Sequence, residues 1–251
     1  MRQKRLRLPL LGILSAMLMT MLTMTTSVTV AQARRDDAQE AIRRGNEKYN
    51  KSEYKLAIDE YRRVPPGAGE SYSTSLYNIG VCYYELWSTG AAIVYYRRAL
   101  EARNGRYPMA HYALGVALKD LKRLSEAKES FTQSIATSDG KYAPAHYMLG
   151  LLVIEEGDSR AAASSFREAI ARSRDGFPAS HNNLGVALAR MGRLPEAERE
   201  FEAALSLADG EFTEAAHNLK VCRSLQALHA KAQLASLKTV ERGHEVSTIS
   251  R

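Results

Sequence analysis

Residues 145–171 read AHYMLGLLVIEEGDSRAAASSFREAIA, and this stretch decides the fold. It places Gly150 twelve residues before Ala162, and the aromatic Phe166 four residues after that alanine. The same pattern occurs five times at a constant spacing of 35 residues. The glycines are Gly45, Gly80, Gly115, Gly150 and Gly185, and the alanines are Ala57, Ala92, Ala127, Ala162 and Ala197. A fixed period of this length predicts similar units stacked in a row, each burying its apolar face against its neighbours.

Each unit is expected to fold as two helices, because helix-forming residues dominate and apolar residues recur at helical spacing. In the fourth unit the predicted helices cover residues 142–156 and 159–173, and in the first unit residues 34–50 and 53–64. The glycine of the first helix lets a neighbouring helix approach closely. In the second helix, an alanine, an aromatic residue and a further small residue form a buried stripe.

Glycine-containing dipeptides are expected to end each unit, because glycine readily takes the left-handed conformation that terminates a helix. An aromatic residue comes shortly after each dipeptide, with one residue between them in three cases and none in the fourth. The dipeptides are Asn104-Gly105, Asp139-Gly140, Asp175-Gly176 and Asp209-Gly210.

The order Leu-Gly, Ala, Phe or Tyr, and Ala resembles the tetratricopeptide repeat, abbreviated TPR, over Arg34 to about Leu237. The period is one residue longer than the family's usual ~34, and the proline that usually closes a unit is absent. The resemblance implies an all-α, right-handed α-solenoid of five helix-turn-helix repeats whose first helices line a concave groove. The expected parts are repeats at about 38–72, 73–107, 108–142, 143–177 and 178–212, a capping helix at 213–237 and a disordered tail at 238–251.

Residues 1–33 have the layout of a secretory signal peptide. Four basic residues precede an uncharged run from Leu8 to Val30, and the small-x-small triplet Ala31-Gln32-Ala33 follows it. We expect cleavage after Ala33 and export, with the bacterial periplasm as the expected location. The alternative is a retained inner-membrane anchor with the repeats outside the cytoplasm, and only then is membrane contact expected.

The charge gives no evidence for a nucleic-acid partner. The formal net charge is +7, and without the four cations of the leader it falls to +3. Mixed charges on helices are typical of a solvated surface. We therefore expect no nucleic acid, and no RNA-reading pentatricopeptide function.

Catalytic and metal-binding groups are spread by the repeat rather than gathered by it. His111, His146 and His181 occupy one equivalent place in successive units, so we expect them to pack between helices and to bind no metal. Cys82 and Cys222 are four periods apart, which predicts two buried thiols rather than a disulfide. No nucleophile elbow, zinc-binding helix or phosphate loop occurs, so the chain is interpreted as a non-enzyme without a cofactor.

A row of tyrosines three residues before the glycines is the candidate binding surface, because aromatic and apolar side chains beside amides suit an extended or helical peptide. The alternative is that the tyrosines only fill the superhelix. A carboxylate clamp is not expected, because Ile42, Met109 and Ala113 stand where relatives carry cations. The candidate groove residues are Tyr77, Asn78, Val81, Tyr84, Tyr112, Val116, Tyr147, Leu151, Ile154, Asn182, Asn183 and Val186.

The sequence therefore predicts an exported scaffold that binds a protein or peptide and helps to assemble or maintain a cell-envelope complex. A second hypothesis is a non-catalytic regulatory or substrate-presenting subunit of an envelope enzyme, such as a glycosyltransferase, or of a secretion system. A third is binding of a small ligand or glycan in the tyrosine-lined groove. The repeat itself does not identify the partner.

Overall fold

The computed structural model describes residues 32–173 and 177–228, which are helical and contain no strand. The predicted leader therefore lies outside the described residues except for its last two positions, and so does the tail at 238–251. The helices are an N-terminal helix at 32–50, α2 (Tyr54–Tyr61), the short 3-10 helix η1 (Pro66–Ala68), α3 (Glu70–Glu85), α4 (Thr89–Ala102), α5 (Pro108–Asp120), α6 (Leu124–Thr137), α7 (Ala143–Glu155), α8 (Ser159–Arg172), α9 (Pro178–Arg190), α10 (Leu194–Leu207) and α11 (Thr213–Leu228).

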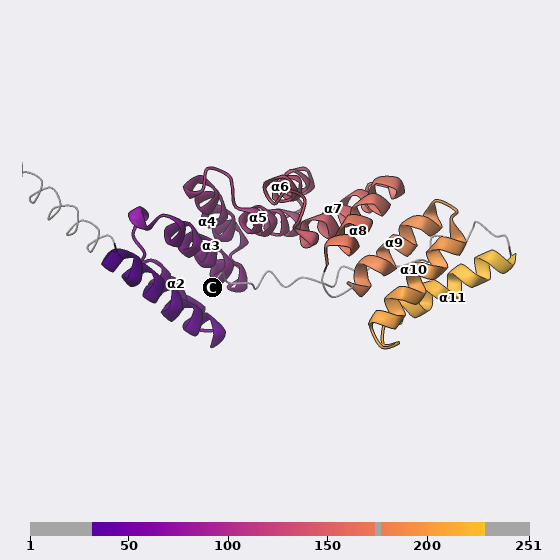
Figure 1. The fold of residues 1–251 in the computed structure, drawn as a ribbon, viewed down its shortest axis with the longest axis horizontal. Coiled ribbons are helices and arrows are strands. Elements are labelled where there is room, and N and C mark those ends of the chain that lie inside the picture. The colour runs from indigo at the N-terminus through magenta and orange to yellow at the C-terminus, as the bar shows by residue number, and fades with distance from the viewer. Residues whose placement is uncertain (1–31, 174–176, 229–251) are drawn as a thin grey trace, which may run out of the picture.

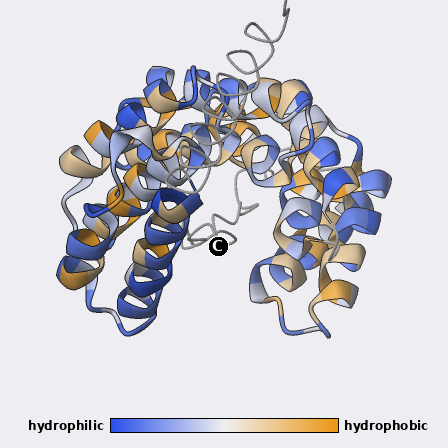
Figure 2. Cartoon of the chain, turned by 60° about the vertical axis from the view of Figure 1, so that its left-hand side comes forward, coloured by the Kyte–Doolittle hydropathy of each residue, from blue (hydrophilic) through white to orange (hydrophobic). Residues whose placement is uncertain are grey.

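The helices pack in sequence order as antiparallel pairs, which form an open arch (Figures 1 and 2). Each second helix packs against its own first helix and against the first helix of the next pair, as α4 does against α3 and α5. First helices also contact one another directly, α3 with α5, α7 with α9 and α9 with α11, more closely than the described second helices do. The first helices therefore form the inner, concave layer of an α-solenoid.

The repeated glycines lie where two helices cross most closely. A Cβ atom built on Gly115 or Gly150 would lie 2.6 Å from the ring of Phe131 or Phe166, which is closer than real Cβ contacts. The five repeated alanines are fully buried beside these rings. The other three crossings have the same arrangement: Gly45 on Tyr61, Gly80 on Tyr96 and Gly185 on Phe201.

Left-handed residues end the second helices at three of the four expected dipeptides. Asn104 and Gly105 have φ values of 49° and 76°, and the Gly105 amide donates to the carbonyl of Leu100 at 2.8 Å. The following pairs of helices repeat this turn at Asp139-Gly140 and Asp209-Gly210. Asp175-Gly176 lies outside the described residues.

Histidine side chains form hydrogen bonds with the backbone of two of these turns. The Nε2 atom of His111 lies 2.8 Å from the carbonyl oxygen of Gly105, and that of His146 lies 3.0 Å from the carbonyl oxygen of Gly140. His181 differs, because its Nδ1 atom lies 2.7 Å from the carboxylate of Glu200. His111 and His146 therefore bond the turn that closes the preceding repeat, whereas His181 bonds the second helix of its own repeat.

The first pair differs from the others. Its second helix ends at Tyr61 instead of the expected Val64, and Pro65 and Pro66 lead into η1. Proline removes a backbone donor and restricts the residue before it, so the two prolines interrupt the helix. Gly69, with a φ of 61°, then starts α3 without an Asn-Gly turn.

Helix α11 covers the C-terminal face of the last pair. Leu225 is 1% exposed, and the Cys222 thiol donates to the carbonyl of Leu194 at 3.3 Å. On its outer side Arg223 bonds Glu198 at 2.6 Å and Glu202 at 2.7 Å. The expected capping helix at 213–237 is therefore described up to Leu228, and its remainder lies outside the described residues.

Candidate partner-binding face

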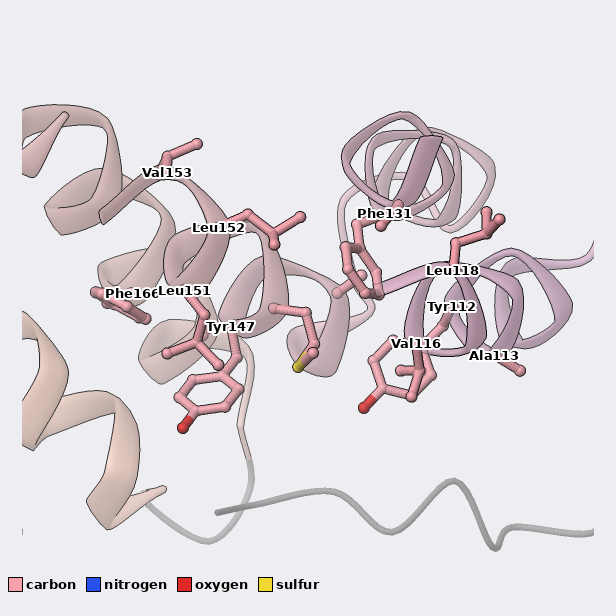
Figure 3. Close-up of a cluster of buried hydrophobic side chains, with 14 of the residues drawn as sticks. Tyr112, Ala113, Val116, Leu118, Phe131, Tyr147, Leu151, Leu152, Val153 and Phe166 are labelled. Carbon is pink, nitrogen blue, oxygen red and sulfur yellow. The ribbon is translucent and has the colours of Figure 1, made fainter. Parts of the chain in front are cut away.

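The three predicted tyrosines lie on the inner helices α3, α5 and α7, with exposed fractions of 2% for Tyr77, 4% for Tyr112 and 0% for Tyr147. Tyr112 and Tyr147 project to the same side of their helices, and their hydroxyl groups lie outermost (Figure 3). Each ring packs on the aromatic residue of its own second helix and on the one that opens the next pair. These ring pairs are Tyr77 with Tyr96 and Tyr107, Tyr112 with Phe131 and Tyr142, and Tyr147 with Phe166 and Phe177.

The structure therefore shows the tyrosines packed inside the superhelix, which was the alternative to a binding role. The aliphatic candidates are also buried, with exposed fractions of 9% or less: Val81, Val116, Leu151, Ile154 and Val186. These side chains form the floor of the inner face, and their contact with a partner stays a prediction. Tyr84 is half-buried, and its hydroxyl donates to the carboxylate of Asp120 on α5.

The candidate asparagines lie in two places along the inner layer. Toward the C-terminal end, Asn218 donates to Asn182 at 2.9 Å, Asn182 donates to Asn183 at 3.0 Å, and Asn183 donates to the hydroxyl of Tyr147 at 3.3 Å. This buried network joins α7, α9 and α11. Toward the N-terminal end, Asn78 on α3 donates to Asn46 at 3.4 Å.

Three buried polar atoms of the inner layer have no hydrogen-bond partner among the described residues. They are the hydroxyl of Tyr112, the Oδ1 atom of Asn78 and the hydroxyl of Ser180. An unpartnered buried polar group is costly, and most such groups in native proteins find a partner in protein or water. Because all three atoms are shielded by their neighbours, a bound chain reaches them only when adjacent side chains move.

A cavity of ≈ 710 Å³ opens at the N-terminal end of the inner face. The N-terminal helix, the start of α3 and the start of α5 form its walls. Arg103 closes one side, with its guanidinium 4.2 Å above the ring of Tyr107 and its Nε atom donating to Ser73 at 2.7 Å. Other lining residues are Gln39, Ile42, Arg43, Asn46, Glu47, Asn50, Glu70, Ser71, Thr74 and Met109.

The sequence did not predict this cavity, because the residues that line it are up to 70 positions apart along the chain. Arg103 and Tyr107 belong to the connection between α4 and α5, and they meet the first helix only after three pairs have stacked. A signal was present in the irregular linker Pro65–Gly69, which departs from the repeat directly before the first α3 residues that line the cavity. Amide and guanidinium donors beside Met109 and Tyr107 suit the main chain of a peptide.

The ionisable groups of this face show no sign of activation. Burial raises the pKa of Tyr77 well above its ordinary value and, with Glu85 nearby, the pKa of the Cys82 thiol to about 12. Both groups are therefore neutral at physiological pH. Among residues 32–173 and 177–228, no three His, Cys, Asp or Glu side chains are grouped so that they could hold a metal ion. Cys82 and Cys222 are both free and buried.

None of the described helices is both long enough and apolar enough to cross a lipid bilayer.

Two tetratricopeptide repeat models match the chain, one at residues 147–212 and the other at residues 73–105 and 110–138. These matches cover most of each pair from α3 to α10, and the glycine, alanine and aromatic positions of these four pairs fall within the matched segments, whereas those of the first pair lie outside them. The chain belongs to the tetratricopeptide repeat family. No curated protein matches it in sequence.

Solved structures of other repeat proteins share the fold. A crystal structure of MamA is 25% identical, covers 66% of this chain and 94% of its own, and has a TM-score of 0.57. YrrB, described as a TPR protein with an unusual peptide-binding site, is 20% identical, with coverage of 77% and 97% and a TM-score of 0.57. PilF of Pseudomonas aeruginosa is 16% identical, with coverage of 82% and 90% and a TM-score of 0.65. The fold is that of a protein or peptide interaction scaffold.

Proposed function

We propose that this protein is an exported scaffold that binds an extended or helical segment of a partner protein along its inner face and holds a cell-envelope complex together. The observation that carries the proposal is the open cavity at the N-terminal end of the inner face, which is lined by amide and guanidinium groups beside Met109 and Tyr107. The buried Tyr112 hydroxyl and Asn78 Oδ1 accept a hydrogen bond from a partner only when neighbouring side chains move aside. The leader at residues 1–33 supports the exported location.

The inner face offers such a segment two kinds of contact. Donors lie at its N-terminal end, where Gln39, Asn50 and Arg103 line the cavity. Beyond the cavity, buried aromatic and aliphatic side chains form the floor of the inner face, with the Tyr112 hydroxyl and Asn78 Oδ1 among them. The peptide-binding site named for YrrB agrees with this class of ligand, although the low identity of that protein supports the fold alone.

The acceptor role is tested by two variants that each remove one buried hydroxyl without a partner. Tyr112→Phe removes the hydroxyl from the inner helix α5, and Tyr96→Phe removes the equivalent group from the second helix α4. We expect Tyr112→Phe to weaken binding of the crosslinked and identified envelope partner about fivefold, because a hydrogen bond contributes about 1 kcal/mol. Tyr96→Phe should leave the affinity unchanged. Equal affinities for both variants and the wild type would contradict the proposed role of the inner face.

The cavity is tested by filling it. Thr74→Arg places a long charged side chain at the start of α3 inside the cavity, whereas Val94→Arg places the same side chain on α4, where Val94 is 53% exposed. Recovery of the partner should fall with Thr74→Arg and persist with Val94→Arg. Loss of recovery in both variants would point to a general charge effect, and loss in neither would remove the cavity from the proposed site.

Export has its own measurement, which is intact mass spectrometry of the protein recovered from fractionated cells. A chain beginning at Arg34 in the periplasmic fraction agrees with cleavage after Ala33. A full-length chain in the membrane fraction agrees with the anchored alternative, and a full-length chain in the cytoplasmic fraction would overturn the exported location.

A further inference from the structure

Trp87 is a large apolar residue that is both strongly exposed and in the left-handed backbone conformation, and no other described residue combines these two properties. It is the single tryptophan of the chain, and it is 94% exposed. Its backbone φ is 58°, in the left-handed region that a bulky aromatic residue rarely adopts. The equivalent positions of the other turns carry Ser52 and Lys122, each with a φ of 59°, and Gly157 and Gly192, for which this conformation carries no steric penalty. The folded core therefore does not explain an indole at this position.

Exposed leucines occur close to the same kind of turn. Leu121 lies in the turn between α5 and α6 and is 46% exposed, and Leu124, the first residue of α6, is 42% exposed. Leu56, near the start of α2, is 49% exposed. These three leucines and Trp87 account for four of the six large hydrophobic side chains that are exposed in the described residues. We call residues 51–56, 86–88 and 121–124 the turn edge.

Two hydrogen bonds between neighbouring first helices show that the three turns lie on the same side of the arch. The hydroxyl of Tyr49 on the N-terminal helix donates to Glu85 at the end of α3, at 3.1 Å. The hydroxyl of Tyr84 on α3 donates in the same way to Asp120 at the end of α5. Both bonds join the C-terminal ends of successive first helices, which are the points where the turns begin. The apolar side chains of the turn edge therefore lie along a single border of the solenoid.

Three lysines of this border are unpaired cations. Lys51, Lys55 and Lys122 are exposed, and none of them forms an ion pair with the rest of the described chain. Glu53 and Glu126 are ion-paired with Lys48 and Arg123, whereas Glu85 and Asp120 accept hydrogen bonds from Tyr49 and Tyr84 and keep their negative charge. The border changes character in the fourth pair, where Glu155, Glu156 and Asp158 surround Gly157.

This combination of groups fits a lipid surface better than a protein surface. Tryptophan is enriched at membrane–water interfaces, and lysine side chains reach from an apolar contact to anionic headgroups. Lysine is depleted from the cores of protein–protein interfaces. We propose that the turn edge docks on an anionic bilayer surface, with Trp87, Leu121 and Leu124 in the headgroup region and the three free lysines near lipid phosphates. This contact requires neither an occupied groove nor a retained leader.

The single tryptophan gives a site-specific test in the full-length chain. Vesicles of phosphatidylglycerol and phosphatidylcholine should shift the fluorescence emission of Trp87 to shorter wavelength, and brominated acyl chains in the same vesicles should quench it. Vesicles of phosphatidylcholine alone should have little effect. Replacing Lys51, Lys55 and Lys122 with Gln should weaken partitioning about 100-fold, since each lysine near an anionic surface contributes about 1 kcal/mol.

A matched control moves the reporter to the opposite border. The double variant Trp87→Ser and Leu207→Trp carries its single tryptophan near the C-terminal end of α10, where Leu207 is 45% exposed. Its emission should not respond to vesicles, even if the leader attaches the chain to them. An unshifted Trp87 emission with anionic vesicles would overturn the proposal. A shift that rises with protein concentration without vesicles would also overturn it, in favour of a second copy of this chain.

Discussion

A single methyl group separates glycine from alanine, and at Gly115 the structure leaves no room for it. The added Cβ would lie 2.6 Å from the ring of Phe131, which is fully buried and cannot move aside freely. We expect Gly115→Ala to lower the free energy of unfolding by about 1–3 kcal/mol, as overpacking does in other cores. Urea unfolding followed by circular dichroism measures this change.

The control is Gly90→Ala on the exposed first turn of α4, where an added Cβ meets nothing within 4 Å. Here the substitution should raise the free energy of unfolding by about 0.5 kcal/mol, because alanine restricts the unfolded chain. Equal effects at the two glycines would show that close crossing is not the reason for the repeated glycine.

Protonation of His111, which bonds the turn before α5, makes the free energy of unfolding depend on pH. Burial lowers the pKa of His111, and the hydrogen bond to Gly105 raises it by a smaller amount, so the net shift is downward. The unfolded chain then binds the proton more readily, and stability decreases as the pH falls through the ordinary histidine value of about 6.5. We expect His111→Gln to reduce the difference between the urea midpoints at pH 7.5 and pH 5.5.

The chosen pH window separates His111 from the carboxylates. The pKa values of Glu126 and Glu198 lie below their ordinary value because of hydrogen bonds to Arg123 and Arg223, so their contribution is lost only at lower pH. A wild-type midpoint that does not change between pH 7.5 and pH 5.5 would contradict the assignment.

At the scale of helices, the sequence was most informative where the repeat is regular. The fourth pair was expected at 142–156 and 159–173, and α7 and α8 lie within two residues of those limits because packing and turn signals coincide. The first pair was less predictable, since Pro65 and Pro66 replace the regular turn. The cavity was not predicted, because it depends on how separate pairs stack. The exposure of Trp87 was not predicted, because the repeat pattern concerns helix faces and not the turn inside a pair.

Helix α11 gives a prediction at this scale. Leu225 is 1% exposed and belongs to the face that α11 buries. Leu225→Ala should destabilise the C-terminal end by about 2–4 kcal/mol, the usual cost of removing a buried leucine side chain. Because each repeat contacts only its neighbours, hydrogen exchange should accelerate in α10 and α11 and remain slow in α5 to α7. Uniform acceleration along the chain would instead indicate a single cooperative unit.

At the scale of the whole molecule, the described core is divided unevenly. One cluster of buried side chains extends from Leu76 to Cys222, whereas a smaller cluster holds the N-terminal helix and α2, with residues such as Ile42, Ile58 and Tyr61. Helix α3 contributes to both clusters: Ile79 and Cys82 belong to the smaller one and Tyr77 to the larger one. The first pair is therefore packed against the remaining helices through one face of α3.

This division predicts that the arch opens first at its N-terminal pair. Hydrogen exchange measured by mass spectrometry should be faster in residues 32–61 than in α5 to α8, because a small cluster protects less backbone. Ile79→Ala removes a side chain that is 2% exposed from the shared face and should increase this difference. Leu225→Ala, at the other end, should leave exchange in residues 32–61 unchanged. If Ile79→Ala accelerated exchange equally in all pairs, the two clusters would behave as one core. If only residues 32–61 responded, the N-terminal cavity would open and close independently of the remaining inner face, and ligand binding there would protect the first pair selectively.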